Sequence, residues 1–321
     1  MGSRIGLAVD SSCDLTPEFI NKHNIEILPI YIHHKDGAYH DTRDTKSMIN
    51  FYRNHSRSRY SKAQSEPLSV TEATRIIEDR LLPKYDRVNV ITINSLKSEV
   101  FNRLTEAALI NEPQFRKLAA ANDRAPFRMR MVDSLTMFSG HAVLVHEFVR
   151  LMQKENMQQS KAIATINNLR DHIYGYIIPH DLSYMRERRH MRKSDHKISW
   201  LSFKLASALN INPIIELHRG ESQAVKKSKG FQGALEDLFA LAKDKIDQGL
   251  ATDTLVMSYA GLLEEISENP ALKAFTEYAK SKGINVTLSM MSTTAAVNVG
   301  PKSFSLAFAF KDETKEALQE I

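Results

Sequence analysis

Hydroxyl and carboxylate side chains gather at three places where a short apolar run of the sequence ends. The three groups are Asp10 with Ser11 and Ser12, Ser95 with Ser98, and Asp133 with Ser134. In open α/β sheets, ligands bind at the carboxyl ends of the strands, so these groups are candidates for ligand contact. The same residue types also cap turns and helices, and both interpretations stay open at this point.

Catalysis at these groups has little support from sequence motifs. The chain contains no Gly-x-Ser-x-Gly nucleophile elbow and no phosphate loop of the Walker type. A catalytic serine would also need a histidine within hydrogen-bond reach, which a sequence cannot show. A hydrolase or phosphotransfer protein is therefore an alternative to a binding protein, and we expect no catalytic residue.

The histidines and the cysteine do not form a metal site in the sequence pattern. His33 and His34 alternate along a strand, so they point to opposite faces. His141 and His146 lie in an apolar helical pattern that favours packing, and Cys13 is expected to be a structural thiol. No spacing resembles a zinc site, so we predict neither metal nor cofactor.

The elements that must position these residues alternate between strand and helix. Strands are expected at 4–10, 25–34, 87–94 and 127–134, and helices at 16–24, 45–55, 69–85, 98–110 and 137–155. The second half is expected to have strands at 174–179, 211–217, 252–260, 284–292 and 304–310, with helices at 161–173, 199–210, 232–247 and 270–283. Strands alternating with helices predict a largely parallel sheet flanked by helices.

The length of the chain predicts two domains. A chain of 321 residues exceeds what a single core usually supports. The polar stretch at 155–160 is the best boundary, which gives one α/β domain over residues 1–158 and a second over 159–321.

Composition narrows the class of protein. Hydrophobic residues make up 42% and charged residues 25%, as in ordinary globular proteins, and no apolar run could span a bilayer. The single cysteine fits a reducing cytoplasm, and no signal-peptide pattern is present. The net charge of +5 permits an anionic partner, but few aromatic residues and no recognition motif argue against nucleic acid.

A series of short blocks, in order along nearly the whole chain, is similar to one known family. The blocks are AVDSSCDLTPE at 8–18, ILPIYIHHKDGAYHD at 27–41, AQSEP at 63–67, INSLKSEVFN at 93–102, VDSLTMFSGHA at 132–142, KISWLSFKLASALNINPII at 197–215 and NVGPKSFSLAF at 298–308. Together they resemble the DegV family of two-domain α/β proteins. The best-understood members are the acyl-binding subunits of bacterial fatty-acid kinase.

The resemblance implies a long-chain fatty acid as the ligand, lying in an apolar tunnel between the two domains. It places the carboxylate head group at the tunnel mouth, on hydroxyl and backbone N–H donors. The head-group residues that it implies are Ser65, Gln64, Asn94, Ser95, Ser98 and Asn298. The supporting turns that it implies are Asp10, Ser11, Ser12, Asp133, Ser134, Gly140 and Gly300.

Several positions depart from the family pattern. Gln64 stands where the family has threonine, Glu99 and Val100 replace a Gly-Thr pair, and Asn298 replaces histidine. Asparagine and glutamine can still donate hydrogen bonds, whereas Glu99 would repel a carboxylate head group or raise its pKa. The alternative function is therefore a divergent member that has lost lipid delivery and acts as an interaction or regulatory protein.

A basic insertion near 186–197 is the candidate partner surface. Its cations are Arg186, Arg188, Arg189, Arg192, Lys193 and Lys197. Such a run is usually a solvated face, and the sharper hypothesis is a docking surface for an anionic protein or, at most, peripheral membrane contact. The resemblance adds a fatty-acid kinase subunit as a possible partner.

Overall fold

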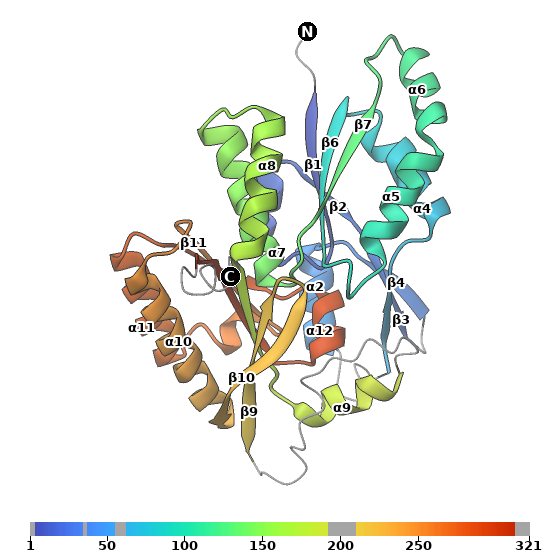
Figure 1. Cartoon of the computed structure of the whole chain (residues 1–321). Helices are drawn as coiled ribbons and strands as arrows, with labels where there is room; N and C mark the ends of the chain where they lie inside the picture. Colours follow the sequence, from blue (N-terminus) through green and yellow to red (C-terminus); the bar gives the residue numbers. More distant parts are fainter. Residues whose placement is uncertain (1–3, 35–36, 55–61, 192–209, 312–321) are drawn as a thin grey trace, which may run out of the picture.

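The computed structural model describes residues 4–34, 37–54, 62–191 and 210–311. Its strands form a four-stranded, a three-stranded and a six-stranded sheet. The four-stranded sheet lies at one end of the molecule and the six-stranded sheet at the other (Figure 1).

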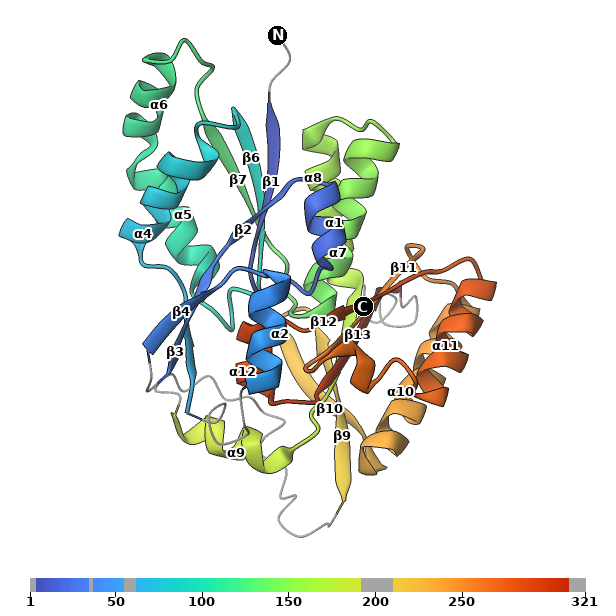
Figure 2. The same cartoon turned by 180° about the vertical axis from the view of Figure 1, so that it is seen from behind.

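The four-stranded sheet confirms the predicted parallel architecture. Its strands, in spatial order, are β2 (Ile25–Leu28), β1 (Ile5–Asp10), β6 (Arg87–Thr92) and β7 (Arg128–Asp133). Every neighbouring pair is parallel. One face packs on α4 (Val70–Ile76), α5 (Val100–Ile110) and α6 (Glu112–Ala120), and the other packs on α1 (Pro17–Lys22), α7 (Ser139–Val149) and α8 (Gln159–Leu169) (Figure 2).

The prediction of a single strand over 25–34 is wrong, because the chain passes from one sheet to another at Pro29. β2 ends at Leu28, and β3 (Ile30–His34) pairs instead with β4 (Gly37–Asp41) and β5 (Gln64–Glu66). Proline has no N–H group to continue a ladder. The Ser11 hydroxyl accepts the N–H of Ile30 at 3.1 Å, which satisfies the next donor after the break.

The six-stranded sheet is mostly antiparallel. Its spatial order is β10 (Glu221–Lys229), β9 (Ile211–His218), β8 (Ile173–Ile178), β13 (Phe304–Ala309), β11 (Thr254–Tyr259) and β12 (Asn285–Met290). Helices α10 (Gly230–Gln248) and α11 (Pro270–Ser281) pack against this sheet. The elements that were not predicted from the sequence include β4, β5, β10, α6 and the short helix α12 (Thr293–Val299).

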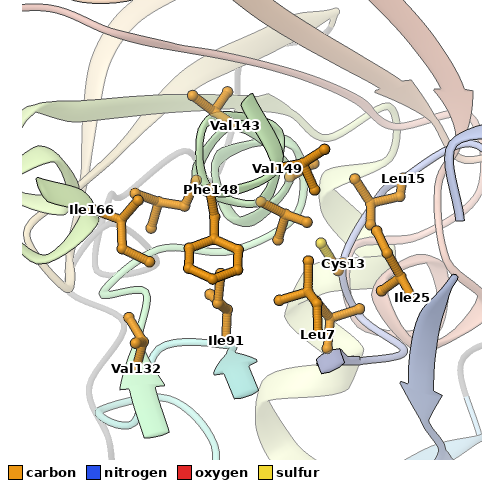
Figure 3. Close-up of a cluster of buried hydrophobic side chains, with 14 of the residues drawn as sticks. Leu7, Cys13, Leu15, Ile25, Ile91, Val132, Val143, Phe148, Val149 and Ile166 are labelled. Atoms are coloured by element: carbon orange, nitrogen blue, oxygen red, sulfur yellow. The ribbon is translucent and has the colours of Figure 1, made fainter. Parts of the chain in front are cut away.

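One apolar cluster joins the two larger sheets through α7. Leu7 of β1 and Phe148 of α7 belong to it, as do Val256 and Ala307 of the six-stranded sheet. Figure 3 shows Phe148 among side chains from β6 and α8. Cys13 lies in the same cluster, where burial raises the pKa of its thiol, in keeping with a structural role. The domain boundary at 158/159 stays a prediction.

Part of the basic insertion falls on a helix. Arg186, Arg188 and Arg189 belong to α9 (Leu182–Met191). Arg192, Lys193 and Lys197 lie outside the described residues, as does nearly all of the helix expected at 199–210. Within the described ranges, no helix is both long and apolar enough to cross a membrane.

Candidate functional site

The opening Asp-Ser-Ser group ties strand ends together. Asp10 Oδ2 accepts the N–H of Ile93 at 2.6 Å, and Oδ1 accepts the N–H of Ser12 at 3.0 Å. The Ser12 hydroxyl also donates to Asp10 Oδ1. These residues are buried, and the carboxylate joins β1 to the end of β6.

The polar groups around Ser95 and Asp133 are joined by hydrogen bonds. Ser95 donates to Asp133 through its hydroxyl at 2.5 Å and through its N–H at 3.1 Å. Asn94 is buried, and its amide nitrogen donates to the carbonyl of Gly220, in the turn between β9 and β10, at 3.1 Å. Asn94 therefore links the four-stranded sheet to the six-stranded sheet, and one of the two N–H donors of its amide is engaged in this contact.

Gly140 lies in the first turn of α7, where a side chain has no room. A Cβ atom at this position would lie 2.2 Å from Thr136 Oγ1. The Ser134 hydroxyl donates to the Thr136 carbonyl at 3.1 Å, which fixes the loop that brings Thr136 there. The requirement for glycine is therefore steric.

We expect Gly140→Ala to lower the free energy of unfolding by about 1–3 kcal/mol, because the added methyl overpacks a buried turn. Urea denaturation measures the change. Gly233→Ala in α10 is the matched control, since nothing lies within 4 Å of its added methyl and helical alanine is favoured by about 0.5–1 kcal/mol. Equal effects of the two substitutions would contradict the steric explanation.

Ser65 and Asn298, which lie far apart in the sequence, meet in the structure. Asn298 Nδ2 of α12 donates to Ser65 Oγ of β5 at 2.9 Å and to the Thr294 carbonyl at 2.8 Å. Both residues are half-buried. Gln64 is exposed and precedes Ser65 on the strand, so it points to the opposite face and is not brought to this pair.

A buried polar network fixes α12 in place. Asp14 accepts the Ser258 hydroxyl at 2.6 Å and the N–H of Ser292 at 2.8 Å. Ser292 is the N-cap of α12, and the N–H of Thr294, the second residue of the helix, donates to Asp41 at 2.8 Å. Two carboxylates from the first half of the chain therefore hold the start of the helix that carries Asn298.

Arg43 supplies the positive charge of this network. Its Nη1 lies 3.7 Å from Asp14 Oδ1, and its Nη2 donates to the carbonyls of Leu15 and Met290. Burial raises the pKa of Asp14 to about 6, although Arg43 and the donors at Ser258 and Ser292 act in the opposite direction. The sequence analysis did not identify Arg43 or Ser258. A serine inside the apolar strand 254–259 was the one available signal.

An apolar cluster lies behind the Ser65–Asn298 pair. We call it the interlayer cluster; it contains Ile32, Phe51, Ala63, Phe138, Ile177, Tyr184, Met185, Ile215, Leu217, Ala260, Met291, Ala295, Ala296, Val297 and Val299. Ile32 pairs with Ser65 across β3 and β5, and Val297 precedes Asn298. The polar pair therefore sits at the edge of apolar packing contributed by both halves of the chain.

A small hollow with mostly apolar lining lies at the end of β1. Leu28, Leu68, Val100 and Leu104 line a hollow of about 10 Å³ there, beside Asp10. A single water needs about 10–15 Å³, so this hollow is far smaller than an acyl chain.

The remaining predicted residues lie around the start of α5. Ser98 is half-buried, and its N–H donates to the Asn94 carbonyl at 3.1 Å. Glu99 is exposed at the N-cap position of α5, which places its carboxylate in solvent. Gly300 follows α12 with φ +95, a conformation that favours glycine. The structure brings together Ser65 with Asn298, and Ser95 with Asp133 beside Asn94.

Metal ligands do not cluster in the part of the chain that the structure describes: no group of three His, Cys, Asp or Glu residues there could hold an ion. His33 Nε2 lies 3.1 Å from Glu66 on the neighbouring strand. His141 is buried and contacts the Ile91 carbonyl at 2.9 Å, and burial lowers the pKa of its imidazole. His141 is thus a packed histidine, as the apolar pattern indicated.

The fold and this arrangement define a class: α/β proteins with a parallel and a mostly antiparallel sheet and a polar pair beside shared apolar packing. The family model described as "uncharacterised protein, DegV family" matches residues 4–311. A DegV domain-containing protein of Xanthomonas campestris pv. campestris is 35% identical over 308 residues, covering 95% of this chain and 97% of the relative. The chain belongs to the DegV family.

Solved structures support the same fold. DegV, a fatty acid binding protein from Bacillus subtilis, superposes with a TM-score of 0.73 at 16% identity, covering 97% of this chain and 100% of the other. A stearic acid-binding protein from Eubacterium ventriosum gives a TM-score of 0.73 at 19% identity, with 97% and 99% covered. These similarities confirm the predicted α/β architecture.

Proposed function

We propose that this protein binds a long-chain fatty acid, with the carboxylate at the Ser65–Asn298 pair. The observation that carries the proposal is the hydrogen bond from Asn298 to Ser65, which joins a hydroxyl and an amide at the edge of the interlayer cluster. Relatives of the same fold are described as binding fatty acids. A carboxylate that replaces this hydrogen bond would accept from the Ser65 hydroxyl and from the Asn298 N–H that it frees.

The acyl chain is proposed to enter the interlayer cluster, in a tunnel between the two domains. Each buried CH₂ contributes about 0.8 kcal/mol, so the chain would supply most of the affinity. Because the cluster is closely packed, the chain must displace side chains to enter. Met185 and Met291 belong to the cluster, and unbranched methionine side chains adapt to such changes with little strain.

The wider role that we propose is non-catalytic. The Asp-Ser groups that could have formed a catalytic site are engaged in hydrogen bonds that join strand ends. We further propose that the protein presents the bound fatty acid to a kinase and that it does not bind nucleic acid. The proposed location is the cytoplasm. The single cysteine supports this location, since cytoplasmic proteins rarely rely on disulfides.

Mass spectrometry of the protein as purified from cells tests the proposal. Under native conditions we expect a mass excess that disappears on denaturation, with a fatty acid recovered in the organic extract. A clean apo mass, together with no uptake of added fatty acids, would overturn the proposal. That result would favour the interaction protein that has lost lipid delivery.

We expect Ser65→Ala to weaken fatty-acid binding about 10-fold, because a hydrogen bond to a charged group contributes roughly 1.5–3 kcal/mol. Direct titration with a fatty acid measures the change. Gln64→Ala is the matched control, since this neighbour faces the other way and should leave the affinity unchanged. Unchanged affinity in Ser65→Ala would place the head group elsewhere.

A further inference from the structure

A basic hollow lies at the other end of the four-stranded sheet, away from the candidate fatty-acid site. It is lined by Arg87 of β6, Arg128 and Arg130 of β7, and Gln159 of α8. Its volume is about 60 Å³, several times the 10–15 Å³ that one water needs. The hollow therefore has room for a small anion with several oxygens.

The three arginines are held side by side by the sheet. Arg87 and Arg128 are direct partners in the parallel register of β6 and β7, and Arg130 follows two residues later on the same face. All three are exposed, and none of their guanidinium groups has a hydrogen-bond or ion-pair partner among the described residues. Neighbouring like charges on adjacent strands are destabilising unless an anion lies between them.

Helix α8 adds a further positive element. It begins at Gln159, and its N-cap residue Gln158 makes no side-chain capping bond. Figure 1 shows that α8 starts at the same end of the molecule as β6 and β7. The free N–H groups and the dipole at a helix start favour a bound anion.

Gln159 supplies an independent indication of a ligand. Gln159 is buried, with 8% of its surface exposed, and its Nε2 donates to Asn89 Oδ1 at 2.8 Å. Asn89 Nδ2 in turn donates to the Gly6 carbonyl at 3.4 Å, which sets the direction of both amides. Gln159 Oε1 is consequently a buried acceptor without a donor among the described residues. Leaving such an atom unsatisfied is unfavourable.

We propose that this hollow binds a monohydrogen phosphate group, held by Arg87, Arg128 and Arg130, with its P–OH donating to Gln159 Oε1. Guanidinium groups match the oxygens of phosphate. A fully deprotonated anion such as sulfate has no hydrogen to donate to the amide oxygen. The site should therefore prefer phosphate over sulfate.

Calorimetric titration at constant ionic strength and near-neutral pH tests the proposal on the full chain. The probes are inorganic phosphate, sulfate and adenosine monophosphate, and the proteins are the wild type, Arg130→Gln and Arg53→Gln. Arg53 is an exposed arginine on α2 (Thr45–Asn54), so its substitution removes the same charge outside the hollow. We expect phosphate to bind the wild type and Arg53→Gln alike, and Arg130→Gln about 10-fold more weakly.

The other results of these titrations show which phosphate compound the hollow prefers and whether the hollow is a phosphate site. A phosphate monoester has a second pKa of about 6 and is mostly a dianion without a P–OH near neutral pH. Tighter binding of inorganic phosphate than of adenosine monophosphate would therefore assign the hollow to the free ion, and tighter binding of adenosine monophosphate would overturn the donation to Gln159 Oε1. Sulfate binding as tight as phosphate, equal affinity in Arg130→Gln, or no phosphate binding at all would overturn the proposal. Arg128→Gln replaces Arg130→Gln if thermal unfolding shows that the first variant does not fold.

Discussion

Replacing Asp14 with alanine should lower the free energy of unfolding by about 3–5 kcal/mol, because it removes one partner of a buried charge pair. Arg43 would remain buried without its carboxylate, and the Ser258 hydroxyl and the Ser292 N–H would lose their acceptor. The start of α12 would lose the contact that joins it to the β1 loop. We therefore also expect Asp14→Ala to weaken ligand binding at Asn298, at the far end of that helix.

Urea denaturation of three variants measures this effect. Asp79→Ala is the matched control: Asp79 is exposed, and surface substitutions usually change stability by less than about 0.5 kcal/mol. Asp14→Asn keeps the size of the side chain and one acceptor oxygen, so its effect should fall between the other two. If Asp14→Ala were no more destabilised than Asp79→Ala, the network would not hold α12.

The protonation of Asp14 should also make the stability of the protein depend on pH. The folded-state pKa is about 6 against an ordinary value of 3.8, so between these values the folded protein keeps a proton that the unfolded chain has lost. The Asp14 contribution to stability is therefore greatest below about pH 4 and falls by roughly 3 kcal/mol as the pH rises through 6. The wild type should lose this stability relative to Asp14→Asn, which has no proton to release.

The local pattern of the sequence was sufficient for most of the four-stranded sheet. β1, β6 and β7 are each followed by a helix, and Thr16 with Pro17 begins α1 as expected. The division at Pro29 was visible as a proline within an apolar run but was not interpreted as a break. β10 was not predicted because it is an edge strand rich in lysine and in exposed side chains, so it lacks a clear apolar periodicity.

The candidate site depended on information that local patterns do not contain. Ser65 and Asn298 are separated by 233 positions, and Asp14 and Ser258 by 244, so no spacing rule could pair them. The resemblance to a family supplied the first pair, and nothing supplied the second. Most polar groups at the strand ends bind backbone and one another: Asp10 accepts the N–H groups of Ser12 and Ile93, and Ser95 donates to Asp133. Their contact with a ligand stays a prediction.

Asn298→Asp should reduce fatty-acid binding about 100-fold or more, because it places a carboxylate where a carboxylate ligand is proposed to sit. The substitution removes the two amide N–H groups that now donate to Ser65 Oγ and to the Thr294 carbonyl. A carboxylate also lies poorly at the C-terminal end of α12, where the helix dipole is negative, at a cost of about 0.3–1 kcal/mol in stability. The loss of binding should therefore far exceed the loss of stability.

Two comparisons show whether charge is the cause. Asn298→His, which restores the residue type found in the family pattern, keeps an N–H donor and should bind the fatty acid at least as well as the wild type. In Asn298→Asp the two carboxyl groups can share a proton once the pH falls toward the range in which one of them is neutral. Affinity should thus recover at acidic pH in Asn298→Asp and not in Asn298→Leu, which lacks both the donor and the charge. If Asn298→Asp bound a fatty acid as the wild type does at neutral pH, the carboxylate could not lie at Ser65 and Asn298, whatever the acyl chain contacts.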